Sequence, residues 1–115
     1  MGGGSKEKGI WLYHDLPRPS AEVKIDKKVE AAWSYDHKSR ELVSYDNVDS
    51  IRLKAEYIQS KSLGGAFFWE AAGDKMGEGS LVGTMAGYLG NLQSSQNMLQ
   101  YPESQYDNIK KALVL

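Results

Sequence analysis

The chain has 115 residues, which suffices for one small domain but not for a complete (β/α)₈ barrel, which needs roughly 200 residues or more. Its formal net charge of −1 provides neither a basic surface for nucleic acid nor a polybasic patch for a membrane. The lack of cysteine excludes disulfides and thiolate chemistry. No apolar stretch is long enough to span a bilayer.

The first part of the chain predicts strands. The Gly-rich opening, residues 1–5, is by composition typical of a flexible linker, and residues 9–16 contain an aromatic cluster that Pro17 ends. Between residues 21 and 45, apolar and polar residues alternate with the period of a strand. The polar run 36–40 separates two of these stretches, so we expect a β-hairpin there.

A helix is predicted over residues 48–61. Asp46 or Asn47 precedes it and can accept the first free backbone N–H groups as N-cap. Gly64 and Gly65 are expected to end it and to release the chain into the next element. At helical spacing, one apolar stripe forms along it: Val48, Ile51, Ala55 and Ile58.

The run from Leu63 to Glu70 is the most informative part of the chain. It is short, apolar and aromatic, which predicts a strand buried on both faces, as in parallel sheets covered by helices. With a helix on either side, it has the order of one unit of a (β/α)₈ barrel. Ligands bind at the C-terminal ends of barrel strands, so Trp69 is expected to face the ligand.

A second helix is predicted from Ser80, as its cap, to Leu89, and a short terminal helix within residues 104–115. Gly90 is expected to end the second helix. Its inward-facing residues are expected to be the apolar ones: Leu81, Val82, Met85 and Leu89.

Several motifs extend over nearly the whole chain: Gly9–Tyr13 with Leu16–Pro17, Leu42–Asp46, Lys54–Ile58, Leu63–Glu70, Ser80–Thr84 and Tyr101–Ile109. Together they resemble the C-terminal portion of fungal glycoside hydrolase family 18 chitinases. The resemblance implies an α/β fold class, or α+β for the isolated piece, as a C-terminal fragment of a (β/α)₈ TIM barrel. Residues 1–46 would be the second half of the inserted α+β domain. Residues 47–115 would be the last αβα unit of the barrel and the C-terminal tail, with the apparent linker as native sequence.

The resemblance also implies an activity for the complete enzyme, the retaining hydrolysis of β-1,4-linked N-acetylglucosamine polymers assisted by the substrate's own acetamido group. In the family, the proton donor lies in an Asp-x-x-Asp-x-Asp-x-Glu motif. This chain lacks that motif and also the Met-x-Tyr-Asp segment of the family. We therefore expect no catalytic residue and no cofactor here, and an inactive chain that contributes only a substrate-binding floor.

Three residues are candidates for substrate binding. By resemblance, Trp69 would stack under a sugar, because an indole offers a flat surface to the apolar face of a pyranose. The alternative is a tryptophan buried in the core. Glu7 matches a family residue that reaches sugar hydroxyls, although a solvated charge near the terminus is an equal alternative. Trp11 would line the cleft or pack inside the inserted domain.

Other polar residues are weaker candidates. Glu70 and Asp74 form a tempting carboxylate pair, but Glu70 is expected to bond within the barrel and Asp74 to cap or fix a loop. His14 and His37 lie too far apart in the sequence, without ligand spacing around them, to predict a metal site.

Three roles remain open: part of a chitinase, a non-catalytic chitin-oligomer-binding protein, or a fragment that works only with the missing N-terminal barrel portion. The expected partners are chitin or N-acetylglucosamine oligomers, not nucleic acid or a membrane. Without neighbouring strands, we expect the isolated chain to be marginally stable, to self-associate, or to pair the 63–70 run with its own hairpin. The resemblance implies a secreted protein, whose signal peptide would lie outside this chain.

Overall fold

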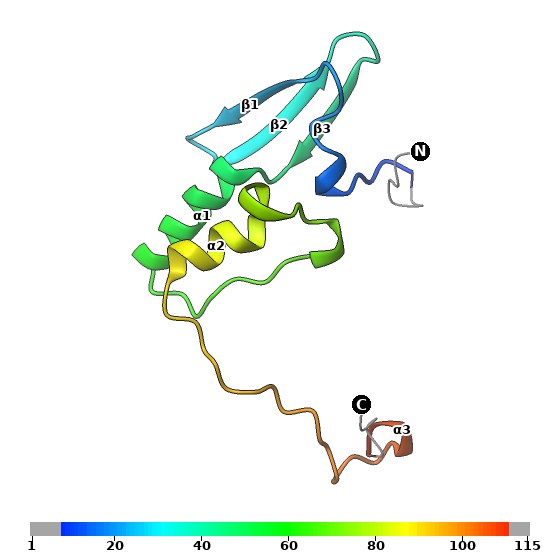
Figure 1. Ribbon diagram of the computed structural model, residues 1–115, viewed down its shortest axis with the longest axis vertical. Coiled ribbons are helices and arrows are strands. Elements are labelled where there is room, and N and C mark those ends of the chain that lie inside the picture. The colour runs from blue at the N-terminus through cyan, green and yellow to red at the C-terminus, as the bar shows by residue number, and fades with distance from the viewer. Residues whose placement is uncertain (1–7, 111–115) are drawn as a thin grey trace.

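The computed structural model describes residues 8–110 (Figure 1). A three-stranded antiparallel sheet lies at one end of the molecule and two packed helices follow it, with a long extended tail beyond them. The elements in chain order are β1 (Glu22–Asp26), β2 (Ala31–Asp36), β3 (Glu41–Tyr45), α1 (Val48–Ser60), α2 (Leu81–Leu89) and α3 (Asp107–Lys110). The arrangement is an α+β piece, as expected for the isolated chain.

The sheet is a meander in the order β1-β2-β3, in which Ser34 pairs with Val23 on one side and Val43 on the other. Each connecting turn begins with an aspartate that accepts backbone N–H groups of the turn. Asp26 accepts from Lys28 at 2.8 Å. The predicted hairpin is therefore confirmed, and β1, where Val23 and Ile25 alternate with polar residues, pairs with it as a third strand. The aspartates stabilise both turns through short-range hydrogen bonds.

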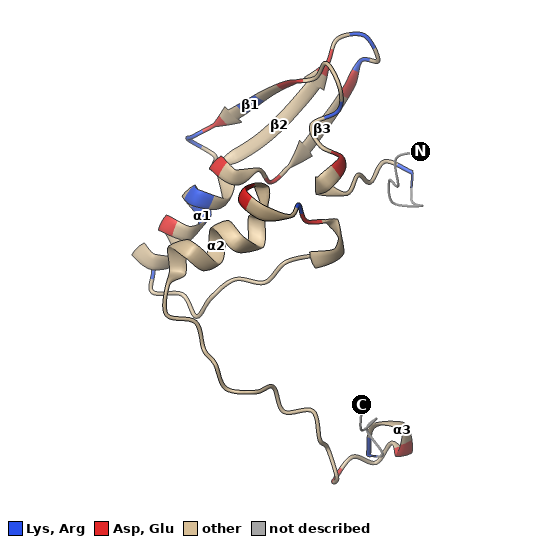
Figure 2. Cartoon of the chain, in the orientation of Figure 1, with Lys and Arg blue, Asp and Glu red and all other residues tan. Residues whose placement is uncertain are grey.

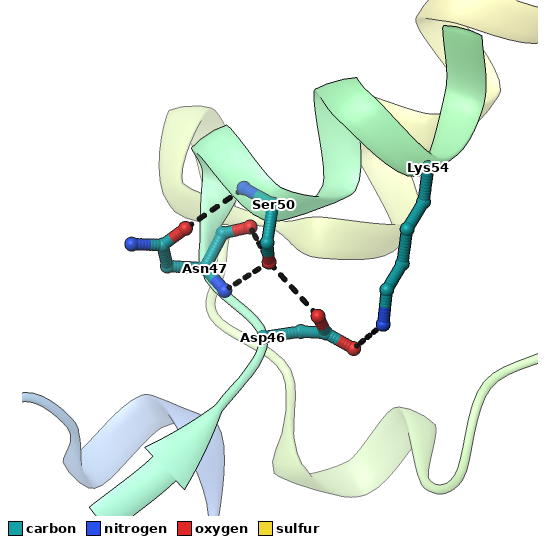
Figure 3. Close-up of polar contacts among 4 residues, drawn as sticks. All are labelled: Asp46, Asn47, Ser50 and Lys54. Carbon is teal, nitrogen blue, oxygen red and sulfur yellow. Dashed lines mark hydrogen bonds and ion pairs between the residues drawn. The ribbon is translucent and has the colours of Figure 1, made fainter. Parts of the chain in front are cut away.

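Helix α1 begins with a capping box (Figure 3). Asn47 Oδ1 accepts the Ser50 N–H at 2.9 Å, and Ser50 Oγ accepts the Asn47 N–H at 3.0 Å. The Ser50 hydroxyl donates to Asp46 Oδ1 at 2.8 Å, and Lys54 Nζ donates to Asp46 Oδ2 at 2.7 Å. Of the two predicted caps, Asn47 is the N-cap. Asp46 instead accepts hydrogen bonds from two side chains of the first two turns of α1.

The end of α1 differs from the prediction. The helix ends at Ser60, and Ser62 rather than a glycine adopts the left-handed conformation, with φ of 51°. The Leu63 N–H then donates to the Ile58 carbonyl at 3.0 Å. The chain has thus left the helix before Gly64, because this backbone hydrogen bond already satisfies a terminal carbonyl.

The core lies between α1 and α2, which run side by side in Figure 1. Its buried members are Ile51 and Ala55 of α1 with Leu81 and Met85 of α2. The predicted stripe of α1 is confirmed, since the partly buried residues packed against this core include Val48 and Ile58. Tyr13, Phe68 and Leu89 pack against it as well.

The prediction for Val82 was wrong, because its side chain is 38% exposed. Leu81, Met85 and Leu89 are four residues apart and so lie on one helix face. Val82 is displaced from that face by one residue, about 100° around the helix. Gly90 follows α2 with a φ of 74°, as predicted for the residue that ends this helix.

The 63–70 segment is extended but forms no strand, so the prediction of a strand buried on both faces is wrong for this chain. Phe67 is 90% exposed and Trp69 is 92% exposed. The alternative pairing with the hairpin is also absent, since the ladders within residues 8–110 join only β1, β2 and β3. A barrel strand is held by neighbours at both edges, and no described segment provides them.

The tail leaves the body of the molecule after α2 and ends in the single turn of α3 (Figure 1). Of the predicted terminal helix, residues 107–110 are helical, and residues 111–115 lie outside the described part. The radius of gyration is 18.2 Å, against roughly 13 Å for a compact domain of this length. No helix within residues 8–110 is both long and apolar enough to cross a membrane.

Candidate functional site

An open cavity of about 790 Å³ lies where the N-terminal segment, α1, the 63–70 segment and α2 come together. Its lining includes two of the three candidate residues, Trp11 and Trp69. Glu70 and Asp74 line it too. The fold therefore brings residues that are far apart in the sequence, from Ile10 to Met85, to one concave surface, and most of that surface is apolar.

Trp69 is among the residues that line this cavity, and its side chain is almost fully exposed. In the extended segment, Phe68 packs against the helical core, whereas Phe67 and Trp69 on either side of it are exposed. This is the alternation of an extended backbone, in which successive side chains point to opposite sides. The Trp69–Glu70 peptide bond is cis. An exposed indole on a concave surface is chemically suited to stack on the apolar face of a sugar ring.

Trp11 has a different environment. The Arg18 guanidinium carbon lies 4.1 Å from the centroid of the indole, a cation–π contact. Trp11 itself is partly buried and lines the cavity. Because Arg18 covers one face of the ring, at most the other face is left for a ligand.

Asp74 is committed to capping α2. Its Oδ1 accepts the Leu81 N–H at 2.8 Å, and its Oδ2 accepts the Val82 N–H at 3.2 Å and the Ser80 hydroxyl at 2.6 Å. Partial burial acts to raise the pKa of this carboxyl group, but hydrogen bonds from Ser80, Leu81, Val82 and Lys75 outweigh it and hold the pKa below its ordinary value. The prediction that Asp74 caps or fixes a loop is confirmed.

The contact between Tyr13 and Lys75 in this region was not predicted from the sequence. Tyr13 Oη donates to the Gly79 carbonyl at 3.1 Å, and the Lys75 ammonium lies 4.5 Å from the centroid of the Tyr13 ring. Lys75 Nζ also donates to the Leu16 carbonyl at 2.5 Å. Burial raises the pKa of Tyr13, and the nearby charge of Asp74 adds to the rise. Tyr13 and Lys75 are about sixty positions apart, so no local sequence pattern indicates that they are in contact.

The remaining candidates are placed as follows. Glu7 lies outside the described residues. His14 pairs with Asp15 at 3.7 Å and His37 with Glu22 at 3.8 Å, so the two histidines belong to separate clusters. Among residues 8–110, no group of three or more His, Cys, Asp or Glu side chains is arranged to hold a metal ion.

Charge is unevenly distributed over the molecule (Figure 2). Residues of both signs alternate along the sheet and α1, whereas residues 62–69 contain no charge and the tail contains few. Residues 62–69, which include the exposed Phe67 and Trp69, therefore form an uncharged stretch that ends at Glu70. Such a surface suits a neutral ligand or an apolar protein partner better than an ionic one.

Comparison with known proteins gives a consistent assignment. The family model described as "Glycosyl hydrolases family 18" matches residues 2–74, more than half of the chain. The match begins at Gly2 and so includes the Gly-rich opening, which favours native sequence over a linker. The C-terminal part that begins at residue 75 lies beyond the matched range.

The alignments with two fungal relatives cover almost the whole chain. Endochitinase 1 of Metarhizium robertsii is 44% identical over 113 residues, 98% of this chain and 27% of the relative. Chitinase 1 of Aphanocladium album is 45% identical over the same shares of the two chains. Chitinase A1 of Niallia circulans is 46% identical over 41 residues, 36% of this chain and 6% of the relative.

The chain thus spans about a quarter of the length of the fungal relatives that it matches most fully. Family 18 domains are TIM barrels, and the α+β piece described above is consistent with a portion of one. From the matched range and the identity to its fungal relatives, the chain belongs to glycosyl hydrolase family 18.

Proposed function

We propose that this chain supplies the substrate-binding floor of a chitin-hydrolysing enzyme, with Trp69 as the surface on which a sugar stacks. The observation that carries the proposal is the 92% exposed indole lining a cavity of about 790 Å³. The relatives that match almost the whole chain are named as chitinases, and chitin is a polymer of N-acetylglucosamine. Trp11 would extend the stacking surface, and Glu7 would bond to sugar hydroxyls.

In this proposal the chemistry takes place on the complete barrel. A glutamate from another part of the barrel protonates the leaving oxygen while the acetamido carbonyl of the substrate attacks the anomeric carbon, with retention. The motif that carries such an acid is absent from these 115 residues. The chain alone therefore binds and orients the sugar without cleaving it. Chitin is an extracellular polymer, so the proposal includes a secreted enzyme.

Titration with the β-1,4-linked tetramer of N-acetylglucosamine, followed by tryptophan fluorescence, tests the proposal. Saturable binding that Trp69→Ala weakens at least tenfold supports it. Trp33→Phe is the matched control, because Trp33 lies in β2 and outside the lining of the cavity. An affinity that is unchanged in Trp69→Ala rules out the floor role of Trp69.

A second candidate function is that of a binding protein without catalysis, favoured by the same exposure of Trp69 in the chain by itself. Mixing the chain with the N-terminal portion of a family 18 barrel that contains the acidic motif separates the two. A gain of chitin hydrolysis on mixing supports the enzyme portion. Saturable saccharide binding with no gain in hydrolysis supports the binding protein.

A further inference from the structure

The turn that precedes α2 forms two hydrogen bonds with the N-terminal segment. Lys75 Nζ donates to the Leu16 carbonyl at 2.5 Å and lies 4.5 Å from the centroid of the Tyr13 ring. From the other side, Tyr13 Oη donates to the Gly79 carbonyl at 3.1 Å. We call these four residues, Tyr13, Leu16, Lys75 and Gly79, the Lys75 clamp.

The N-terminal segment lies close to the turn next to the clamp. A Cβ atom at Gly73 would lie 3.2 Å from Leu12 Cδ2 and 3.7 Å from the Tyr13 backbone nitrogen. Within the turn, a Cβ atom at Gly79 would lie 3.2 Å from Lys75 Cδ, so Gly79 leaves room for the lysine stem. Leu16 is buried and Lys75 is partly buried, so the hydrogen bond between them is shielded from water. A charge-assisted hydrogen bond in such a place is stronger than an exposed neutral one.

The clamp joins the two segments that carry the cavity tryptophans. Trp11 lies two residues before Tyr13, and Trp69 lies six residues before Lys75. No β-ladder within residues 8–110 holds either segment, and the only regular structure of the N-terminal one is a single 3₁₀ turn, Tyr13–Asp15. The relative placement of the two indoles therefore depends on side-chain contacts such as those of Lys75.

We propose that Lys75 is a positioning residue that holds Trp11 in the lining of the cavity that Trp69 also lines, so that a long saccharide contacts both indoles. This proposal rests on the proposed saccharide-binding function. A disaccharide that occupies Trp69 alone does not need the clamp, whereas a tetramer does. Loss of the clamp should therefore change the dependence of affinity on saccharide length.

The test compares Lys75→Met with Lys75→Arg in the full chain, using the β-1,4-linked dimer and tetramer of N-acetylglucosamine as ligands. Lys75→Met keeps the apolar stem but loses the ammonium group, and it should weaken tetramer binding by roughly tenfold. Dimer binding should stay within about twofold of the unchanged chain. Lys75→Arg retains a cation and its donors, so it should restore most of the tetramer affinity. Lys61→Met, at an exposed position outside the cavity lining, is the matched control.

A second readout does not require a ligand. In a chain with Trp33→Phe and Trp69→Phe, Trp11 is the only tryptophan, and Lys75→Met should increase its quenching by acrylamide. If Lys75→Met fails to fold, Tyr13→Phe serves instead, since it removes only the hydrogen bond to Gly79. It should weaken tetramer binding by about threefold.

Equal losses for dimer and tetramer would assign Lys75 a general structural role and overturn the proposal. Unchanged tetramer affinity together with unchanged Trp11 quenching would overturn it as well. If the unchanged chain binds no saccharide, the proposed function fails. The quenching measurement then decides by itself whether Lys75 holds the segment, and unchanged quenching refutes the clamp.

Discussion

The Ser80 hydroxyl donates to Asp74 Oδ2 at 2.6 Å and at the same time accepts the Gly83 N–H at 2.8 Å. Together the two side chains satisfy the N–H groups of Leu81, Val82 and Gly83 at the start of α2. Asp74 lies five residues after Trp69, so the helix cap also fixes the end of the segment that carries this indole. Stability of α2 and placement of the candidate site are thereby linked.

Asp74→Ala should destabilise the chain by about 1–2 kcal/mol, because it removes a helix cap and leaves N–H groups without their acceptor. Urea unfolding followed by far-UV circular dichroism measures this change. Asp49→Ala is the control, since Asp49 is exposed in the first turn of α1. A loss in Asp74→Ala no larger than in Asp49→Ala would contradict the capping role.

The lowered pKa of Asp74 predicts a pH dependence of stability. A carboxyl group with a folded-state pKa below the unfolded value stabilises the fold at higher pH, where it is ionised. Its contribution is complete above the ordinary value of 3.8 and is lost as the pH falls through the lowered folded pKa. Asp74→Asn should flatten this acid limb in unfolding experiments between about pH 5 and 2. An unaltered slope would show that other carboxyl groups produce it.

Asn47→Ala should lower the free energy of unfolding by about 0.5–2 kcal/mol, because Asn47 caps α1 through its bond to the Ser50 N–H. Asn47→Asp retains an acceptor and should lose much less, with a benefit from the helix dipole. Thermal melts of the two variants give the comparison. Equal losses for both would mean that the amide group matters for a reason other than capping.

Phe67 and Phe68 are adjacent but should respond differently to truncation. Phe68 packs against the core of α1 and α2, so Phe68→Ala should cost about 1–3 kcal/mol, less than a fully buried phenylalanine. Phe67 is exposed, and Phe67→Ala should leave the stability within about 0.5 kcal/mol. Urea unfolding of both variants measures this. Similar losses in the free energy of unfolding would contradict the packing of Phe68, and not Phe67, against the core.

The exposed apolar surface around Phe67 and Trp69 predicts self-association of the isolated chain. Phe67→Asp adds a charge to this surface and should shift the sedimentation of concentrated samples towards the monomer. Val23→Asp, a change at an exposed position of β1, is the control. A chain that stays monomeric at high concentration and melts in one sharp transition would contradict the expected marginal stability.

Local chemistry allowed most elements to be predicted from sequence. The turn aspartates, the Asn47 cap and the i, i+4 apolar stripes act over a few residues, so the hairpin, α1 and α2 could be read directly. The prediction that Asp74 caps or fixes a loop is confirmed as well, since its carboxylate accepts the Leu81 N–H at the start of α2, seven residues later. The position of Trp69 at the end of an apolar run indicates a candidate site residue, and its role in binding stays a prediction.

The amino-acid sequence by itself determined the family, the helices and the antiparallel strands, because motifs and caps depend on neighbouring residues. Only the tertiary structure decided that the 63–70 segment is unpaired, since a strand requires partners that the described residues do not provide. It also decided that Trp11 and Trp69 share one cavity and that Lys75 reaches Leu16. Such long-range contacts depend on how the chain folds back on itself, and no local pattern encodes them.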